Sequence, residues 1–266
     1  MLDAEKLVAG VDAIIIDCRF VLGKPEAGYE QYLAGHIPGA HYLHLEDDLS
    51  GPVARHGGRH PLPDPGTLAA RLAGLGIGPE TPVVAYDDSR FAFAARFWWL
   101  LRALGYRPPS LLNGGYQAWV AAGGAVATEV PRPRPCSQPA VGDYAGYCDI
   151  GELPQLQAAG AVLLDSREPR RYVGLEEPID PVAGHIPGAL NVPWQRVSDE
   201  RGRLRDPAAL AEHFAAVAEG SPRIVYCGSG VTACVNLYAL AQLGDNDALL
   251  YPGSWSDWCS YLAIPD

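Results

Sequence analysis

Short runs of apolar residues alternate along the chain with longer segments in which apolar residues recur at helical spacing. Ile224, Val225 and Tyr226 form one such run, which predicts a buried strand, and Val231 to Leu243 carries a helical period that stops before Gly244. Further helical segments are predicted at Pro65 to Leu75, Phe91 to Leu104 and Pro207 to Ala218. This alternation is typical of an α/β domain, in which helices cover both faces of a mainly parallel sheet.

Four sequence blocks occur twice, in the same order. The first copies are AIIIDCR at 13–19, AGHIPGA at 34–40, PVVAY at 82–86 and GGYQAW at 114–119, and the second are AVLLDSR at 161–167, AGHIPGA at 183–189, PRIVY at 222–226 and GSWSDW at 253–258. The chain is therefore a duplication. The Pro-rich stretch PRPRP between the copies is typical of a stiff linker. We expect a first domain at 1–124, a linker at 125–147 and a second domain at 148–266.

The segment RIVYCGSGVTAC, from Arg223 to Cys234, places a cysteine where a strand passes into a helix. Backbone N–H groups of a Gly-rich turn can converge on one point, and the positive end of the helix dipole adds to their field. Such surroundings favour the nucleophilic thiolate. We predict that Cys227 is a reactive thiolate in an anion-binding loop, the alternative being an inert buried cysteine. The corresponding loop of the first half, YDDSRF at 86–91, has an aspartate in that place, which predicts a catalytically inactive half.

Composition and charge narrow the class of protein. The 266 residues are 48% hydrophobic and 19% charged, as expected for a folded globular protein. A formal net charge of −11 argues against nucleic acid or an anionic membrane as a partner. Because the sequence shows neither a membrane-spanning run nor a signal peptide, we expect a cytoplasmic protein. The six cysteines include no CxxC pair, so neither a zinc site nor a disulfide framework is predicted.

The repeated blocks and the cysteine loop resemble the tandem-domain rhodanese superfamily of sulfurtransferases. The resemblance covers nearly the whole chain and includes the twin HIPGA motifs, the inactive first half and a six-residue loop that begins with the cysteine. It implies two duplicated rhodanese-like domains of α/β fold. The loop CGSGVT is similar to that of 3-mercaptopyruvate sulfurtransferases, whereas thiosulfate-using members typically carry CRKGVT. A loop with glycine and serine suits a monoanionic keto acid held by hydrogen bonds, while cationic loop side chains suit a dianion.

The resemblance also implies a mechanism and the residues that carry it. Cys227 would attack the sulfane sulfur of a small-molecule donor, keep it as a persulfide and pass it to cyanide, a thiol or a reductant such as thioredoxin, without a cofactor or metal. Arg171, in DSREPRRYVG, matches the arginine that binds the anionic group of the donor. Ser229, His60 and Glu46 match a relay that assists the carbonyl of the keto acid. The backbone amides that would cradle the outer sulfur are those of Gly228, Ser229, Gly230, Val231 and Thr232.

One departure from the resembled pattern leaves the donor open. Mercaptopyruvate enzymes usually have a second arginine in an EPR element before HIPG, and here Ile179 occupies that position in EPID. Thiosulfate therefore stays open as a second or even the main donor, and a non-catalytic sulfur carrier is a further alternative. A cysteine phosphatase needs Cys-x5-Arg to clamp a phosphate. Counting from Cys227 reaches Ala233, which argues against that class.

Two further pairs of polar residues are predicted to be structural. His36 and His185 lie in the HIPGA motif, which occurs equally in the half without a nucleophile. Its Pro-Gly sequence is what a shaped turn before a strand requires. Asp17 and Asp165, each followed by x-Arg at the end of an apolar run, are expected to form ion pairs.

Overall fold

The computed structural model describes residues 1–217 and 221–262, and by their internal contacts the residues form two compact units. Unit 1 comprises Met1–Gly51, Pro63–Ala145 and Ser198–Leu204, and unit 2 comprises Pro52–Leu62, Gly146–Val197 and Arg205–Asp266. Each unit thus includes one short segment from the other half of the sequence. The expected boundaries at 124 and 148 stay a prediction, and 263–266, the end of the second predicted domain, lie outside the described residues.

The centre of unit 1 is a parallel sheet in the order β2-β1-β3-β4. Its strands are β1 (Ile14–Asp17), β2 (His41–Tyr42), β3 (Val83–Tyr86) and β4 (Ser110–Leu111). β1 and β3 pair without a bulge, from Ile14 opposite Val83 to Asp17 opposite Tyr86. Because the strands are parallel, the residues that follow β1 and β3 come together at one edge of the sheet, where ligands bind in folds of this class.

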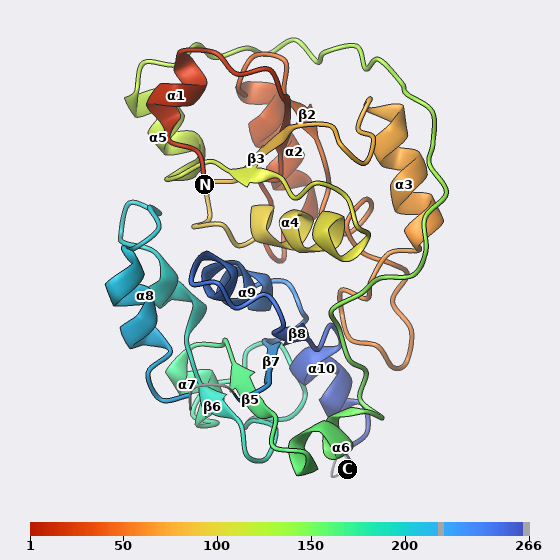
Figure 1. Cartoon of the computed structure of the whole chain (residues 1–266), viewed down its shortest axis with the longest axis vertical. Coiled ribbons are helices and arrows are strands. Elements are labelled where there is room, and N and C mark those ends of the chain that lie inside the picture. The colour runs from red at the N-terminus through yellow and green to blue at the C-terminus, as the bar shows by residue number, and fades with distance from the viewer. Residues whose placement is uncertain (218–220, 263–266) are drawn as a thin grey trace. The chain divides into compact units, whose positions relative to one another are not determined.

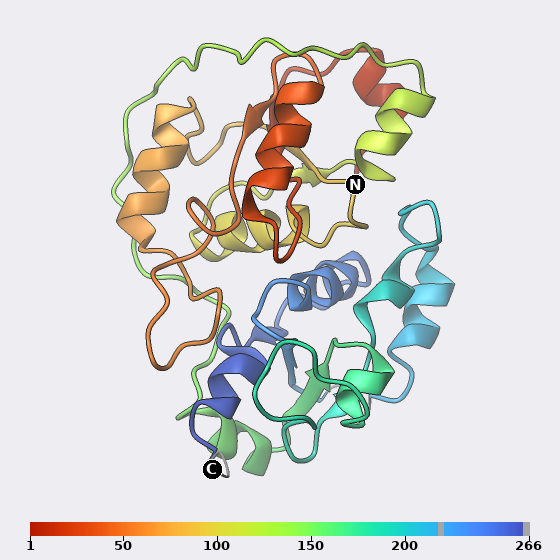
Figure 2. The same cartoon turned by 180° about the vertical axis from the view of Figure 1, so that it is seen from behind.

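Helices cover both faces of this sheet (Figures 1 and 2). The helices of unit 1 are α1 (Ala4–Val8), α2 (Pro25–Ala34), α3 (Pro65–Gly74), α4 (Ala94–Ala103) and α5 (Gly115–Ala121). Val84 and Tyr86 join an apolar cluster with residues of α1 and α5, whereas α4 contacts β3 and β4. All four residues of β3 are buried, as expected for a strand with a helical layer on each side.

Unit 2 contains a second parallel sheet with the equivalent order, β6-β5-β7-β8. Its strands are β5 (Val162–Asp165), β6 (Leu190–Asn191), β7 (Arg223–Tyr226) and β8 (Leu249–Leu250). β5 and β7 pair from Val162 opposite Arg223 to Asp165 opposite Tyr226. This register repeats that of β1 and β3, so the residue after Tyr226 lies at the same edge of its sheet as the residue after Tyr86.

Helices again pack on the two faces of the second sheet. They are α6 (Leu153–Ala158), α7 (Pro169–Tyr172), the 3₁₀ helix η1 (Trp194–Val197), α8 (Pro207–His213), α9 (Ala233–Gln242) and α10 (Ser254–Cys259). Ile224 and Tyr226 join an apolar cluster with α6 and α10, whereas α9 contacts β7, β8 and η1. The predicted fold, two duplicated α/β domains with parallel sheets, is confirmed.

The Asp-x-Arg sequences after the central strands form buried ion pairs, as predicted. Arg19 Nη2 lies 2.6 Å from Asp17 Oδ2, and Arg167 Nη2 lies 2.7 Å from Asp165 Oδ2. Each guanidinium also donates to the backbone carbonyl of the glycine that precedes the HIPGA histidine, at 2.7 and 2.6 Å respectively. In both units the ion pair therefore ties the end of a strand to the repeated turn.

The histidines of the HIPGA motif have the same structural environment in both units. His36 Nδ1 lies 2.7 Å from the carbonyl oxygen of Tyr32 and its ring stacks on that tyrosine. His185 Nδ1 lies 2.8 Å from the carbonyl oxygen of Tyr172, and the His185 ring stacks on the ring of that tyrosine. Because the contact is present in both halves, the structural interpretation of these histidines is confirmed.

The predicted helical segments are found, with shorter bounds. α4 begins at Ala94 instead of Phe91, because Phe91 has a φ of 72°, outside the helical region. α8 ends at His213, and the apolar residues Phe214 and Val217 continue the buried pattern in turns. The predicted end of that segment, Ala218, lies outside the described residues.

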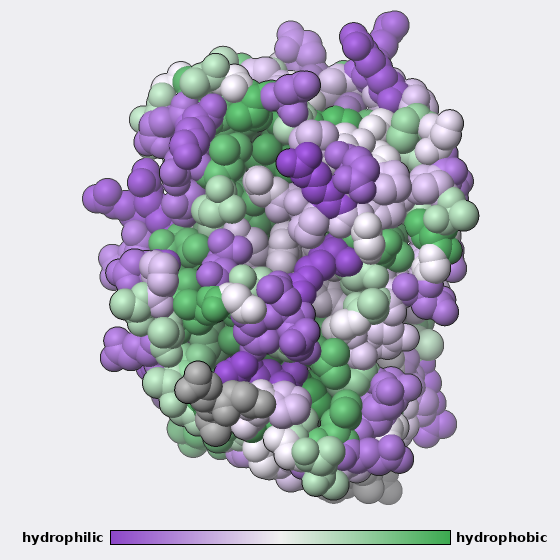
Figure 3. All heavy atoms as spheres, viewed as in Figure 1, coloured by the Kyte–Doolittle hydropathy of each residue, from purple (hydrophilic) through white to green (hydrophobic). Residues whose placement is uncertain are grey.

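Among residues 1–217 and 221–262, no helix has both the length and the apolar character needed to cross a bilayer. On the face drawn in Figure 3, hydrophilic side chains are widespread and apolar side chains form small groups between them.

Candidate functional site

The candidate nucleophile lies directly after the central strand β7. Cys227 follows Tyr226, and the loop Gly228 to Thr232 leads into α9. The N–H of Cys227 donates to Ser254 Oγ at 3.1 Å, and its carbonyl accepts from the N–H of Trp255 at 3.0 Å. Cys227 is buried, and the start of α10 fixes its backbone.

Two positions of the loop favour glycine, each for a different steric reason. Gly230 has a φ of 74°, and a Cβ there would lie 2.3 Å from the carbonyl oxygen of Pro252. Its backbone therefore both adopts a conformation that L side chains avoid and approaches another backbone closely. At Gly228 a Cβ would instead meet two guanidinium groups, those of Arg59 and Arg171. Both glycines belong to the predicted anion cradle. Gly230 allows the loop to contact the backbone of Pro252, and Gly228 allows the two guanidinium groups to approach the loop.

The segment Pro52–Leu62 comes from the first half of the sequence, but its contacts assign it to unit 2. The N–H of Gly57 donates to Asp257 Oδ1 at 2.7 Å, and the N–H of Arg59 donates to Ser256 Oγ at 3.1 Å. Gly58 packs so closely that a Cβ would lie 2.4 Å from the carbonyl oxygen of Gly253. The segment therefore runs along the start of α10, the helix that also holds the backbone of the cysteine.

This arrangement brings together two of the predicted relay residues. His60 Nδ1 lies 2.8 Å from Ser229 Oγ, and both side chains belong to residues that are buried. Ser229 is the second residue after Cys227, so the pair lies in the cysteine loop. Glu46, the predicted acid, lies in an exposed turn of unit 1. Unit 2, described by itself, contains the serine and the histidine of the relay but not the glutamate.

Arg171 lies in a chain of ion pairs beside the cysteine loop. Arg171 Nη2 lies 2.6 Å from Glu177 Oε1 and 3.1 Å from Asp180 Oδ2. Asp180 Oδ1 also forms an ion pair with Arg59 Nη1. Glu177 in turn contacts Arg167, at 3.2 Å. The predicted donor-binding arginine is therefore held by two carboxylates, and it shares each of them with another arginine.

Arg59 is not among the residues predicted from the sequence. Burial lowers the pKa of its guanidinium below the ordinary value, and the negative charge of a Cys227 thiolate opposes that shift. A guanidinium stays protonated at neutral pH in spite of such a shift. The one signal that could have found Arg59 is its place next to His60 in GRHPLP. Arg59 is thus a cation close enough to the cysteine loop to interact with the nucleophile.

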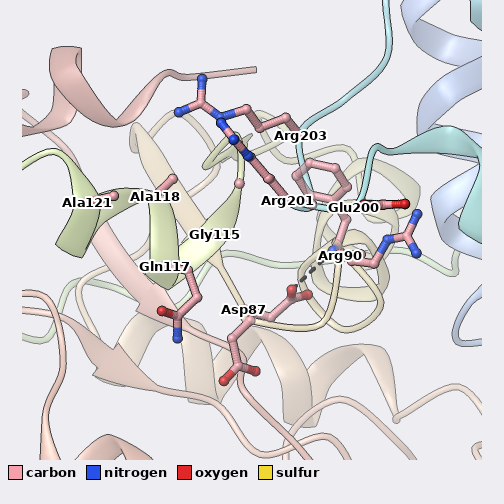
Figure 4. A pocket seen from close by; sticks show the side chains of 13 residues that line it. Asp87, Arg90, Gly115, Gln117, Ala118, Ala121, Glu200, Arg201 and Arg203 are labelled. Atoms are coloured by element: carbon pink, nitrogen blue, oxygen red, sulfur yellow. Dashed lines mark hydrogen bonds between the residues drawn. The ribbon is translucent and has the colours of Figure 1, made fainter.

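The loop of unit 1 that corresponds to the cysteine loop borders a pocket of about 470 Å³ (Figure 4). Its lining residues are Asp87, Asp88, Arg90, Phe91, Gly114, Gly115, Gln117, Ala118, Ala121, Glu200, Arg201, Gly202 and Arg203. The buried carboxylate of Asp87 accepts hydrogen bonds from four backbone N–H groups, those of Ser89, Phe91, Phe93 and Ala94, at 2.8 to 3.1 Å. The loop amides of unit 1 are therefore occupied by a side chain of the loop itself.

The cysteines and the acidic side chains offer little for a metal or a disulfide. None of the six cysteines, all of which lie in the described residues, forms a disulfide. Within residues 1–217 and 221–262, no group of three or more His, Cys, Asp or Glu residues is arranged to hold a metal ion. The groups that the structure does place at the site are a thiol, a Ser–His pair and two arginines.

Comparison with known proteins agrees with this geometry. The family described as Rhodanese-like domain matches residues 2–122 and 149–261. The chain belongs to the rhodanese family. Its two matches leave out the Pro-rich stretch between the repeats.

Relatives of this rhodanese are named for two sulfur donors. A Pseudomonas aeruginosa protein, provisionally named a 3-mercaptopyruvate sulfurtransferase, is 46% identical over 274 residues, covering 97% of this chain and 94% of its own. The Mycobacterium tuberculosis protein SseB, provisionally named a thiosulfate sulfurtransferase, is 43% identical over 263 residues, covering 97% and 91%. The crystal structure of SseA from Escherichia coli, a 3-mercaptopyruvate sulfotransferase by its description, has a TM-score of 0.84 at 31% identity and covers 96% of this chain and 98% of its own. The resemblance and the enzyme class predicted from the sequence are confirmed: this rhodanese is a sulfurtransferase.

Proposed function

We propose that this rhodanese transfers the sulfane sulfur of 3-mercaptopyruvate, through a persulfide on Cys227, to cyanide, a thiol or thioredoxin. Two kinds of observation support the donor. Relatives that cover nearly the whole chain carry that donor in their names. The loop CGSGVT also places a serine hydroxyl, with its histidine partner 2.8 Å away, two residues from the nucleophile.

The reaction divides into two half-reactions. The Cys227 thiolate attacks the sulfur of 3-mercaptopyruvate, an S–S bond forms, and the C–S bond breaks with its electron pair remaining on the carbon. That carbon is conjugated with the ketone, so the leaving group is the enolate of pyruvate, which takes up a proton. In the second half-reaction the acceptor attacks the outer sulfur of the persulfide, and the S–S bond breaks to return the Cys227 thiolate. Both steps move sulfur between nucleophiles, so no cofactor is required.

The residues around the cysteine have distinct roles in this proposal. Arg171 binds the carboxylate of the donor, because a guanidinium matches a planar carboxylate with paired N–H donors. Ser229 donates to the donor's carbonyl oxygen as enolate charge develops on it, His60 holds the serine hydroxyl through their hydrogen bond, and Glu46 would support the histidine. The amides of Gly228, Ser229, Gly230, Val231 and Thr232 stabilise the persulfide anion.

The observation that carries the proposal is the hydrogen bond between His60 and Ser229 in the cysteine loop. Thiosulfate has no carbonyl for such a pair to polarise, whereas a keto acid has one. The same proposal places the enzyme in a reducing compartment, the cytoplasm, where a catalytic thiol stays free.

The test measures steady-state turnover with 3-mercaptopyruvate and with thiosulfate in parallel, with cyanide as acceptor. We expect kcat/KM to be higher for 3-mercaptopyruvate. Cys227→Ser should lower kcat at least ~10³-fold, because the covalent step loses its nucleophile. Cys136→Ser, at an exposed cysteine, is the matched control and should leave kcat unchanged.

Thiosulfate is the second candidate donor, and one observation favours it. The shared carboxylate of Asp180 holds two guanidiniums at the loop, and two cations suit a dianion. A higher kcat/KM with thiosulfate would overturn the keto-acid proposal in favour of this one. Absence of turnover with either donor, together with sulfur uptake from a protein persulfide, would identify a carrier.

A further inference from the structure

The pocket of unit 1 has walls that come from three parts of the sequence (Figure 4). They are the loop 87–91 after β3, the helix α5 with the preceding Gly114, and residues 200–203 from the second half of the sequence. All of these residues belong to unit 1. The pocket therefore lies at the carboxyl end of β3, where ligands bind in α/β folds. Its volume of about 470 Å³ is in the range of sites that hold whole organic molecules.

The segment Ser198–Leu204 forms a hairpin that its own hydrogen bonds hold in shape. The N–H of Asp199 donates to the carbonyl oxygen of Arg203 at 2.8 Å. Asp199 Oδ1 accepts from the backbone N–H groups of Arg201 and Arg203, both at 2.9 Å. The carboxylate of the hairpin is thus used for its backbone, whereas the side chains of the two arginines extend from it in one direction in Figure 4 and line the pocket.

Contacts at both ends fix this hairpin on the rest of unit 1. Arg90 donates to the hydroxyl and to the carbonyl oxygen of Ser198, at 2.9 and 2.8 Å. At the other end, the N–H of Leu204 donates to Asn113 Oδ1 at 2.9 Å. Between them, a Cβ on Gly114 would lie 3.3 Å from a side-chain carbon of the hairpin. This wall of the pocket is therefore preorganised, which lowers the entropy cost of binding.

The two arginines of the hairpin have no carboxylate partner in the described part of the chain. Among residues 1–217 and 221–262, no acidic side chain forms an ion pair or a hydrogen bond with the guanidinium of Arg201 or Arg203. The chain has 31 acidic and 20 basic residues, so acidic groups are in excess. Two like charges in one hairpin repel each other, and an anion bound between them would remove that repulsion. Their N–H donors are therefore available to a ligand.

The acidic side chains of the pocket do not cancel these two charges. The carboxylate of Asp87 accepts four backbone amides. Burial raises the pKa of the Asp88 carboxyl, against the opposing charge of Arg19. Glu200 is exposed and extends to the side of Arg90 in Figure 4. The wall formed by the two hairpin arginines is therefore the positive side of the pocket.

We propose that this pocket binds a small organic carboxylate. Arg201 and Arg203 bind its carboxylate group, because guanidiniums give a planar carboxylate charge-assisted hydrogen bonds. Phe91 and Ala118, which are buried and line the pocket, contact its apolar part. The site is independent of the proposed sulfur transfer, since it uses no residue of the cysteine loop.

The test uses benzoate, a carboxylate on a flat apolar ring, titrated into isotope-labelled wild-type protein and followed by NMR. We expect the backbone N–H signals of Gly202 and Gln117, which line the pocket, to shift in a saturable manner. Arg201→Ala and Arg203→Ala should each raise the Kd ~10-fold, because each removes a charge-assisted hydrogen bond. Arg132→Ala, at an exposed arginine elsewhere in unit 1, is the matched control and should leave the Kd unchanged.

Two further probes test the class of ligand. Neutral benzamide keeps the ring and should bind ~10-fold or more weakly than benzoate, whereas sulfate keeps the charge without the ring and should also bind more weakly. Equal affinity for benzoate and benzamide would overturn the role of the arginines, and a lower Kd for sulfate would identify a site for inorganic oxyanions instead.

The position of the shifts and the variants can also contradict the proposal. Benzoate shifts confined to Gly228 and Gly230 would mean that only the cysteine loop binds the carboxylate, and the pocket of unit 1 would then have no such function. A Kd in Arg201→Ala and Arg203→Ala equal to that of Arg132→Ala would likewise overturn it. Neither result bears on the proposed function, which is measured by turnover at Cys227.

Discussion

The loops after β3 and β7 begin with the same backbone geometry and then differ in what fills them. The carbonyl of Asp87 accepts from the N–H of Tyr116 at 2.9 Å, and that of Cys227 accepts from the N–H of Trp255 at 3.0 Å. In unit 1 the carboxylate of Asp87 takes four loop amides for itself. A thiol has a single sulfur and no second acceptor atom to span such a set of amides. The turn that follows the strand can therefore bind a carboxylate of its own chain, as in unit 1, or leave its amides available for an anion that comes from outside.

The two loops differ in the residue that adopts a positive φ. In the aligned repeats Gly230, with a φ of 74°, corresponds to Arg90, with a φ of 59°. Arg90 keeps this unfavourable conformation while its guanidinium donates to Ser198 Oγ and to the Ser198 carbonyl, at 2.9 and 2.8 Å. A residue with a side chain is thus possible at this φ, provided that other contacts hold it. In unit 2 the nearby Pro252 carbonyl removes that possibility.

The largest effect that would test this comparison is expected from Gly230→Ala. The added Cβ would lie 2.3 Å from the carbonyl oxygen of Pro252, and φ is positive. We expect the free energy of unfolding to fall by about 2–4 kcal/mol and kcat/KM to fall ~100-fold or more, because the loop around Cys227 must shift. Denaturant unfolding and steady-state kinetics measure the two effects.

Gly244→Ala is the matched control for that substitution. Gly244 has a φ of 91° with nothing within 4 Å of a built Cβ, so the substitution adds the same kind of backbone strain without the clash. It should cost only about 1 kcal/mol and leave kcat/KM unchanged. Equal losses of stability and activity in both variants would mean that strain alone, and not the approach of Pro252, makes Gly230 necessary.

Much of this comparison could be predicted from the sequence, because it depends on local patterns. The apolar run before Cys227 and each Asp-x-Arg pair involve residues that are close in the sequence, and the repeated blocks are found by comparing the two halves directly. The assignment of Pro52–Leu62 to unit 2 could not be predicted, since it depends on contacts such as that between His60 and Ser229, 169 residues apart. The pairing of Arg59 with Asp180 is likewise long-range, at 121 residues, and no local period marks it.

The second prediction concerns the carboxylate that fills the loop of unit 1. Burial raises the pKa of the Asp87 carboxyl above its ordinary value, against the opposing effect of its amide hydrogen bonds. The folded state therefore keeps this proton at pH values where the unfolded chain has lost it. The contribution of Asp87 to stability is then fully present below the unfolded pKa and is lost as pH rises through the folded pKa.

Asp87→Asn removes this titration and replaces one amide-accepting oxygen with an amino group. We expect the free energy of unfolding to fall by about 1–3 kcal/mol near pH 4, with the gap to the wild type narrowing as pH rises toward neutral. Asp12→Asn, at an exposed aspartate, is the control and should show no such gap. A gap that widens with pH would show instead that the four amide bonds outweigh burial. Sulfur transfer by Cys227 should stay within ~2-fold of wild type, since unit 1 has no nucleophile in this loop.

The smallest effect, and the finest test of the difference between the loops, is expected from Gly228→Ala. Gly228 corresponds to Asp88 of the other loop, so a side chain is compatible with the position in unit 1. In unit 2 a Cβ would lie 3.1 Å from Arg59 Nη2, the far end of a flexible side chain that can give by a few tenths of an ångström. We expect the free energy of unfolding to change by less than about 1 kcal/mol. KM for the anionic donor should rise ~3- to 10-fold at nearly constant kcat, because the added methyl group also crowds the guanidinium of Arg171, which is proposed to bind the donor's carboxylate. Gly74→Ala, where a built Cβ meets nothing within 4 Å, should leave KM unchanged. A wild-type KM in Gly228→Ala would mean that the guanidiniums can move aside without loss of donor affinity, and the space above Gly228 would then not set the specificity of the site.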